Sequence, residues 1–258
     1  MDPINEGTSK KIEEFIFSKC RNFSGAVIGI SGGIDSALVA TLAVRAIGPK
    51  RVHGLLLPAN PEQYSEVNMQ DARELAESLG VDYNIIALDS IFNGFKYHSA
   101  TNDWCKSDMV KGNIMARLRM ICLYAYANAH NCIVLGTTNK TEAMIGYYTK
   151  WGDGAVDIEP IVDLYKTEER VLAKALGVPE KFITKKPTAD LWAGQTDEGE
   201  IGMTYAKLDE ILSACVINDQ GKLVCHDICS VDPEELNMVQ NMFNRSAHKR
   251  VMPEGPIL

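Results

Sequence analysis

Two adjacent glycines separate an apolar run from an apolar helical pattern near the start of the chain. They lie in "AVIGISGGIDSALVATLAVRAIG", residues 26–48. Because adjacent glycines weaken regular structure, their presence indicates that the backbone must be bare at this point. A strand that ends in such a turn and continues into a helix offers free N–H groups and a positive dipole end to an anion. The stretch predicts a phosphate site, to which Ser31 and Ser36 add hydroxyl donors.

An aspartate inside this turn, Asp35, would repel a phosphate. A magnesium ion that bridges the carboxylate and the phosphates removes the conflict. Two better-known phosphate loops do not fit, because no lysine follows the glycines as in GxxxxGK[ST] and their spacing is not that of GxGxxG. From residue types alone, a tight strand-to-helix turn without a ligand is the alternative.

A second polar group follows a later apolar run, in "LGTTNKTEAMIGYYTKWGDGAVDIEPIVDLYKTE", residues 135–168. Charged residues there are interleaved with glycines and with Tyr147, Tyr148 and Trp151, a mixture that favours binding of planar groups close to the backbone. Lys166 opens a helical pattern, where a positive charge opposes the helix dipole unless an anion compensates. This favours a binding role for Lys166, although a solvated polar loop is the alternative for the segment.

The elements that must position these residues are apolar runs that alternate with helical patterns. The runs lie at 26–30, 51–58, 83–88 and 132–137, and the helical patterns at 9–20, 35–47, 65–79, 111–129, 167–177 and 233–247. Continuously apolar strands of this kind predict the α/β class, with a single doubly wound parallel sheet and helices on both faces. Ligands bind such a sheet at the carboxyl ends of its strands. The polar segment 184–204 is expected to be a loop and a candidate lid, with Trp192 as its apolar plug.

Composition narrows the class of protein. The formal net charge of −8 argues against a broad nucleic-acid-binding surface. The sequence has no apolar run of membrane-spanning length and no signal core, so we expect a cytoplasmic protein with no membrane contact. The seven cysteines are scattered and indicate reduced thiols, and "CHDIC" at 225–229 lacks a second ligand pair for zinc. We expect residues 1–258 to form one domain.

The turn Ser31–Ser36 resembles the SGGxDS loop of the ATP pyrophosphatases, which split ATP between the α and β phosphates and adenylate a substrate. The block 135–168, "KGNIMARLRM", "KKPTADLWAGQTDEGEIGMTY" and the terminal "HKR" resemble the NAD synthetase family over residues 9–253. The resemblance implies an adenine nucleotide alpha-hydrolase-like fold. It also implies ATP-dependent amidation of deamido-NAD to NAD, AMP and pyrophosphate through an adenylated nicotinate carboxylate. We expect the ammonia-dependent type, because no nitrilase-like domain is present.

The resemblance also implies roles by position. The loop that cradles the ATP phosphates consists of Gly29, Ile30, Ser31, Gly32, Gly33, Ile34, Asp35 and Ser36. Further ATP contacts are Thr137, Lys166 and Thr188, and the magnesium ligands are Asp35 and Glu142. Contacts to deamido-NAD are Arg117, Lys150, Asp157, His248 and Lys249. Asp153 lies near the ammonia site and could capture ammonium and assist its deprotonation, so the catalytic set is Asp153, Lys166 and Asp35. The family implies a homodimer with the dinucleotide at the subunit interface.

Two other functions compete with this one. Another SGGxDS adenylating enzyme, such as a tRNA-modifying enzyme, would share the loop, but the negative charge and the lack of a basic appendage argue against it. A non-catalytic ATP-binding sensor would also keep the loop. It would not need Glu142, Lys150, Asp153 and Lys166 together.

Overall fold

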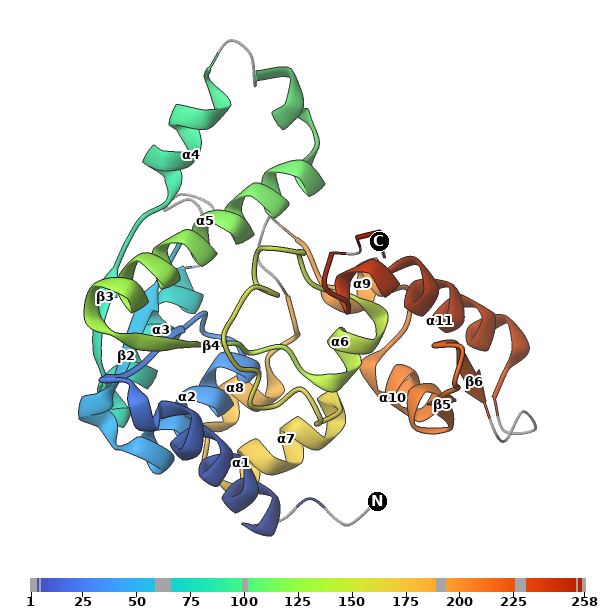
Figure 1. Cartoon of the computed structure of the whole chain (residues 1–258), viewed down its shortest axis with the longest axis horizontal. Coiled ribbons are helices and arrows are strands. Elements are labelled where there is room, and N and C mark those ends of the chain that lie inside the picture. The colour runs from blue at the N-terminus through green and yellow to red at the C-terminus, as the bar shows by residue number, and fades with distance from the viewer. Residues whose placement is uncertain are drawn as a thin grey trace.

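A four-stranded parallel sheet forms the centre of the molecule in the computed structural model, which describes residues 4, 6–58, 66–98, 102–188, 194–225, 231–253 and 255–256 (Figure 1). Its strands are β1 (Gly25–Gly29), β2 (Val52–Leu56), β3 (Asp82–Ile85) and β4 (Cys132–Leu135), in the order β3-β2-β1-β4. The register pairs Ala26 with Val52 and with Ile133. The predicted α/β fold with a parallel sheet is confirmed.

Side chains alternate between the two faces of the sheet, and each face is covered by its own helices. Ala26 and Ile28 pack with α1 (Glu6–Lys19), α2 (Ile34–Ile47), α3 (Glu66–Leu79), α7 (Lys166–Ala175) and α8 (Glu180–Thr184). Val27 and Val134 pack on the opposite face with α5 (Asp108–His130), beside α4 (Asp89–Lys96). This double cover explains why the strands β1 and β4 are apolar on both sides.

A second unit packs beside the sheet around its own apolar core. It contains α6 (Lys140–Ile145), α10 (Tyr205–Ser213), the antiparallel hairpin β5 (Cys215–Ile217) and β6 (Leu223–Cys225), and α11 (Pro233–Arg245). The short helix α9 (Asp197–Ile201) adds Ile201 to the same core. Figure 1 shows this unit at one side of the molecule, with α6 between α10 and the sheet. It joins the sheet domain's helical layer through contacts of α10 with α7.

Several elements differ from the sequence-based expectation. The strand expected at 83–88 is the short edge strand β3, in which Ile85 is 42% exposed. The segment 184–204 was expected to be a loop, which is wrong at Asp197–Ile201, where Thr196 caps helix α9. Residues 189–193, which include Trp192, lie outside the described residues. Among the described residues, no helix has the length and apolar character that crossing a membrane requires.

Candidate active site

One cavity opens at the carboxyl ends of β1, β2 and β4, where a parallel sheet ordinarily binds its ligand. Its volume is about 490 Å³. The glycine turn lines it from Gly29 to Asp35, and Thr137, Asp153 and Thr188 line other walls. The cavity thus brings together residues that the sequence places in three separate blocks.

The glycine turn holds its shape through its own hydrogen bonds. Gly32 has φ +76°, and a Cβ there would lie 2.4 Å from the carbonyl oxygen of Asn68, so only glycine fits. The Ser36 hydroxyl donates to the Gly33 carbonyl and accepts from the Ser31 N–H at 3.1 Å each. Ser36 is buried and does not line the cavity. In this structure the Ser36 hydroxyl shapes the turn, and its contact with a phosphate stays a prediction.

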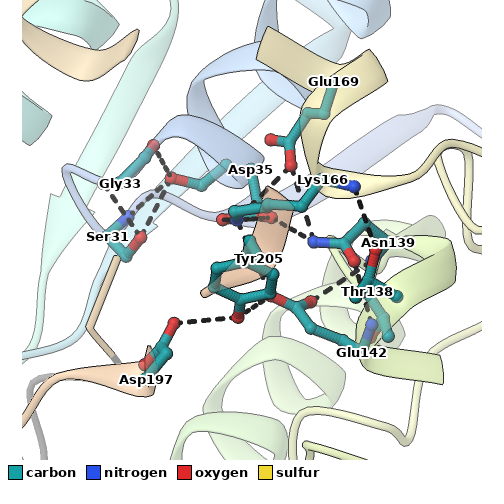
Figure 2. A network of polar contacts seen from close by, with 12 residues as sticks. Ser31, Gly33, Asp35, Thr138, Asn139, Glu142, Lys166, Glu169, Asp197 and Tyr205 are labelled. Carbon is teal, nitrogen blue, oxygen red and sulfur yellow. Dashed lines mark hydrogen bonds and ion pairs between the residues drawn. The ribbon is translucent and has the colours of Figure 1, made fainter. Parts of the chain in front are cut away.

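A buried lysine lies behind the turn and pairs with the acidic residue inside it. Lys166 Nζ is 2.5 Å from Asp35 Oδ1 and 2.6 Å from Oδ2 (Figure 2). The same ammonium lies 3.4 Å from Glu169 Oε2 and 3.6 Å from Glu142 Oε1. Lys166 is fully buried and does not line the cavity. Its ammonium therefore faces Asp35 and does not point into the space where ATP would lie.

Asn139 fixes the two predicted metal ligands relative to each other. Its side-chain oxygen accepts from the Glu142 N–H at 3.0 Å, and the Glu142 carboxylate accepts from the Asn139 N–H, which forms a capping box at the start of α6. Its amide nitrogen donates to Asp35 Oδ1 at 2.9 Å. The sequence analysis gave Asn139 no role, although the spacing Asn139-x-x-Glu142 is the signal of such a cap.

The packing of α6, α7 and α10 sets where Glu142 and Lys166 lie. The Thr141 hydroxyl donates to Asp209 Oδ1 at 2.5 Å and accepts from the Lys166 N–H at 3.0 Å. Asp209 Oδ2 accepts from the Thr167 N–H at 2.8 Å. The buried Asp209 carboxylate on α10 therefore holds the first turns of α6 and α7 together through hydrogen bonds. The sequence analysis missed Thr141 and Asp209, because their pairing joins residues far apart in the chain.

Tyrosines extend the polar network toward α9. The Tyr205 hydroxyl lies 3.1 Å from Asp197 Oδ2 and 3.4 Å from Glu142 Oε1 (Figure 2). The Tyr147 hydroxyl donates to Asp197 Oδ1 at 3.2 Å. Burial, together with the neighbouring carboxylates, raises the pKa of both phenols, so they act as donors to Asp197 and Glu142 throughout the neutral range.

Acids outnumber cations in this cluster. Burial and repulsion from Asp35 raise the pKa of Glu142 to about 8, and the same two causes hold the pKa of Glu169 well above its usual range. Burial also disfavours the charged form of Asp35, but the Lys166 ammonium and the hydrogen bonds around it outweigh that and lower its pKa. Glu169 Oε1 is buried and has no hydrogen-bond partner among the described residues. One lysine does not balance these carboxylates.

A magnesium ion fits this donor set. The carboxylates of Asp35 and Glu142 lie close together, since both are within 3.6 Å of the Lys166 ammonium. Because the pKa of Glu142 is raised to about 8, a second positive charge would be needed to keep both carboxylates ionised at neutral pH. The described residues contain no group of three or more side chains that could hold a metal. Magnesium commonly takes one or two carboxylates and completes its shell with substrate phosphates and water. The two carboxylates are therefore sufficient on the protein side.

Two further acids lie at or behind the wall of the cavity: Asp153 lines it, and Glu159 packs against Gly136, which lines it. Asp153 is open to the cavity and accepts from the Thr149 N–H at 2.9 Å, and partial loss of hydration inside the cavity raises its pKa. Glu159 lies against Gly136, where a Cβ would be 2.3 Å from its Cδ. It accepts from the Thr138 N–H at 3.0 Å, and burial raises its pKa to about 7. The sequence analysis gave Glu159 no role.

The residues expected to contact deamido-NAD do not all face the cavity. Lys249 lines it and donates to the carbonyls of Gly146 and Tyr148 at 2.6 and 2.5 Å. Lys150, Arg117 and His248 form a chain outside its lining: Lys150 Nζ donates to the His248 carbonyl at 2.5 Å, and Arg117 Nη2 to the Lys150 carbonyl at 3.2 Å.

Asp157 and Arg117, which were also expected to contact deamido-NAD, do not line the cavity. The Asp157 carboxylate accepts from the Val134 N–H at 2.8 Å and from the Tyr124 hydroxyl at 3.1 Å, and it is absent from the cavity lining. In this structure it holds the end of β4. Arg119 lines the cavity where Arg117 does not, and its Nε donates to the Leu57 carbonyl.

Comparison with known proteins agrees with this geometry. The family model described as NAD synthase matches residues 8–253. The chain belongs to the NAD synthase family. It is 44% identical to the NH(3)-dependent NAD(+) synthetase of Thermococcus kodakarensis over 99% of this chain and 96% of that one. It is 45% identical to the enzyme of the same description from Pyrococcus horikoshii, over 96% of this chain and 93% of that one.

Solved structures of the family superpose over nearly the whole chain. The NMN synthetase of Francisella tularensis gives a TM-score of 0.85 at 39% identity, with 98% of each chain covered. The NH3-dependent NAD synthetase of Campylobacter jejuni gives a TM-score of 0.80 at 36% identity, also with 98% of each chain covered. The fold and the family are thus supported by sequence and by structure.

The glycine turn yields a first prediction. Gly32→Ala is expected to lower the free energy of unfolding by at least ~1–3 kcal/mol, because the residue has a positive φ and its Cβ would meet the backbone of Asn68. Gly33→Ala is the matched control, since its φ is −97° and its Cβ would meet only the movable Ser31 hydroxyl, at 3.3 Å. Urea denaturation measures both. Equal losses in the two variants would contradict the account of the turn.

The buried lysine yields a second prediction. Lys166→Met is expected to lower the free energy of unfolding by about 3–5 kcal/mol, because it leaves buried carboxylates without their counter-charge. Lys140→Met is the control, since Lys140 opens α6 as Lys166 opens α7 but pairs with Asp163, which is 93% exposed, and is expected to change stability by at most about 1 kcal/mol. Chemical denaturation at pH 7 measures the free energy of unfolding of both variants. A Lys166 variant as stable as the Lys140 variant would refute the role of Lys166 as counter-charge to the buried carboxylates.

Glu159 yields a third prediction, on pH. Its folded pKa of about 7 lies above the ordinary 4.5, so its favourable contribution is present below pH 4.5 and is lost as pH rises through 7. Glu159→Gln is expected to remove that loss, which amounts to about 1.4 kcal/mol for each unit of pKa shift. The measurement is the stability difference from wild type between pH 5 and pH 8, with the exposed Glu14→Gln as control. A constant difference across this range would contradict the assignment.

Proposed function

We propose that this chain amidates deamido-NAD with ammonia at the expense of ATP and forms NAD, AMP and pyrophosphate through an adenylated nicotinate carboxylate. The observation that carries the proposal is the link, in an NAD synthase family member, between the bare glycine turn that lines the cavity and the cluster around Lys166. Asp35 belongs to both, since it lines the cavity and pairs with Lys166. Relatives described as NH(3)-dependent NAD(+) synthetases, similar over nearly the whole chain, support it.

The glycine turn and the start of α2 would hold the phosphates of ATP. Backbone N–H groups at a helix N-terminus favour negative charge, and both Gly32 and Gly33 line the cavity there. The Gly33 N–H donates to the Ser31 hydroxyl at 3.2 Å, so a phosphate oxygen would take over this donor. Thr137 and Thr188 line the same cavity and would contact the nucleotide.

Asp35 and Glu142 would hold magnesium, which when bound neutralises charge on the phosphates. Lys166 keeps Asp35 ionised and oriented by binding both of its oxygens. Asn139 fixes the position of Asp35 relative to Glu142. With the phosphates placed in this way, the nicotinate carboxylate can attack the α-phosphate without a protein nucleophile, so catalysis rests on positioning and on charge.

Asp153 would bind ammonium, the source of the amide nitrogen. Most ammonia is ammonium at neutral pH, and a carboxylate that is open to the cavity attracts that cation. The raised pKa of Asp153 makes its carboxylate a better acceptor for the ammonium proton than an ordinary aspartate. The proton would pass to the Asp153 carboxylate as nitrogen attacks the adenylate, and AMP would leave.

We further propose that the enzyme is a cytoplasmic homodimer whose interface includes α5, and that residues 1–258 act as one domain. Met109 and Ile121 on α5 are 65% and 55% exposed, and Trp151 nearby in the polar block is 47% exposed. Arg117, Lys150 and His248 lie outside the lining of the cavity of a single chain. A dinucleotide that reaches from the cavity toward a second subunit would account for both observations.

A second candidate is amidation of the mononucleotide instead of the dinucleotide. The chain is similar over 98% of its length to the NMN synthetase of Francisella tularensis, with a TM-score of 0.85. Both candidates share the adenylated nicotinate carboxylate and the ammonia step. They differ only in the nucleotide that carries the nicotinate.

One assay tests the proposal against its competitors. Purified protein with ATP, magnesium and an ammonium salt receives deamido-NAD or the corresponding mononucleotide, and amide, AMP and pyrophosphate are measured. The proposal predicts equal amounts of all three products with deamido-NAD and slower turnover of the mononucleotide. Faster turnover of the mononucleotide would establish the second candidate. Absence of pyrophosphate release with either would favour the ATP sensor or another adenylating enzyme.

The role of Asp153 can be separated from adenylation. In Asp153→Asn, exchange of labelled pyrophosphate into ATP with deamido-NAD and no ammonia is expected to persist. Amide formation is expected to fall by roughly 10²-fold, the lower end of what positioned proton transfer contributes. Asp163→Asn, at a position 93% exposed, is the control and should keep both activities. Equal loss of exchange and amide formation in Asp153→Asn would reject the role.

A further inference from the structure

Two cysteines lie directly opposite each other in the C-terminal hairpin, away from the cavity. β5 and β6 pair antiparallel, with Cys215 opposite Cys225, Val216 opposite Val224 and Ile217 opposite Leu223. Figure 1 shows the hairpin beside α10 and α11. Both residues are thiols in the structure. The sequence analysis considered Cys225 only as a zinc ligand and rejected that role.

Hydrogen bonds in the turn between β5 and β6 show whether the two cysteines form a hydrogen-bonded or a non-hydrogen-bonded cross-strand pair. The Asn218 N–H donates to the Lys222 carbonyl at 2.9 Å, and the Gly221 N–H donates to the Asn218 carbonyl at 2.8 Å. Hydrogen-bonded and non-hydrogen-bonded pairs alternate along antiparallel strands. Three steps from the bonded pair Asn218 and Lys222, the two cysteines therefore occupy a non-hydrogen-bonded position. There opposite Cα atoms are about 4.5 Å apart, which lies within the range that a disulfide spans.

The two thiols differ in access. Cys215 is 8% exposed and packs in the core of the second unit, whereas Cys225 is half-buried. Burial, followed by the hydrogen bond that the Cys215 thiol donates to the Cys225 sulfur, raises the pKa of Cys215 to about 12. A small oxidant would thus reach Cys225 first, and Cys215 would act as the second, resolving thiol.

We propose that Cys215 and Cys225 are a reversible disulfide site that closes the β5–β6 hairpin by exchange with a low-molecular-weight disulfide. The Cys225 thiolate attacks one sulfur of the small disulfide, forms a mixed disulfide and releases one thiolate. The Cys215 thiolate then attacks the Cys225 sulfur, so that the protein disulfide forms and the second small thiolate leaves. The two cysteines lose two electrons and two protons, and the small disulfide becomes two thiols.

The disulfide would tighten the unit that carries part of the active site. Cys215 follows α10, whose Tyr205 touches Glu142 and Asp197. Strand β6 leads toward α11, and Gln240 on α11 donates to the Leu223 carbonyl at 3.1 Å. Linking β5 to β6 would join the end of α10 covalently to the strand that α11 holds. Because the bond restrains the unfolded chain, we expect a more heat-stable protein.

The test uses the full-length folded protein and oxidised glutathione at pH 8.5. Peptide mapping without reductant is expected to give a Cys215–Cys225 linked peptide that dithiothreitol separates, and oxidation is expected to raise Tm by several degrees. In Cys215→Ser, glutathione should remain attached to Cys225. In Cys225→Ser, Tm should no longer respond to oxidation. Cys132→Ser, which alters a half-buried cysteine elsewhere, is the control and should keep the linked peptide.

The outcomes that overturn the proposal are specific. They are linkage of Cys225 to Cys229 in place of Cys215, glutathionylation of Cys225 in the wild type without progress to the internal bond, or oxidation of other cysteines while this pair stays reduced. Each result is read from the same peptide map, so the test does not depend on a variant that fails to fold. None of these outcomes depends on whether the proposed amidation occurs.

Discussion

The ammonium of Lys166, shared among buried carboxylates, is the interaction on which the site depends. It contacts both oxygens of Asp35 and lies within 3.6 Å of Glu142 and Glu169. A buried charge is costly unless it is paired and hydrogen-bonded, so the three helices that bring these groups must meet closely. The strand order β3-β2-β1-β4 makes this possible, because it places β1 beside β4 and hence the glycine turn beside the start of α6.

The pairing is incomplete. One lysine faces several acids, Glu142 has a pKa raised to about 8, and Glu169 keeps a buried oxygen without a partner among the described residues. Fully balanced pairing would stabilise the fold but would leave nothing to attract a cation. Departures from local rules of this kind are expected at functional sites. The same imbalance explains how Asp35 can stand inside a turn that we propose binds phosphate.

The part of the fold that repeats a pattern was predictable, and the part that depends on distant contacts was not. Apolar runs and helical periodicity predicted the sheet and the helices α1, α2, α3, α5, α7 and α11. The short elements α8, α9 and β5–β6 have too few residues to show a period, and α9 exists because Thr196 caps it. The glycine turn was recognisable because a bare backbone has a local sequence signal.

Side-chain roles were predictable only in part. The sequence pointed to Asp35, Glu142 and Lys166, and they lie together. It did not show that Lys166 faces Asp35 and not the cavity, because that pairing spans 131 residues. Ser36 and Asp157 carry the right chemistry for ligands, but backbone donors and acceptors of the turn and of β4 engage them in the structure.

We propose that a divalent cation binds beside Lys166, where the carboxylates outnumber the positive charges. The most direct measurement is a crystal structure of the protein with a non-hydrolysable ATP analogue and Mn²⁺ in place of Mg²⁺, with the metal located by its anomalous scattering. We expect a metal peak at direct ligand distance from the carboxylates of Asp35 and Glu142 and from phosphate oxygens over the glycine turn. A triphosphate bound at the turn with the metal far from both carboxylates would contradict it.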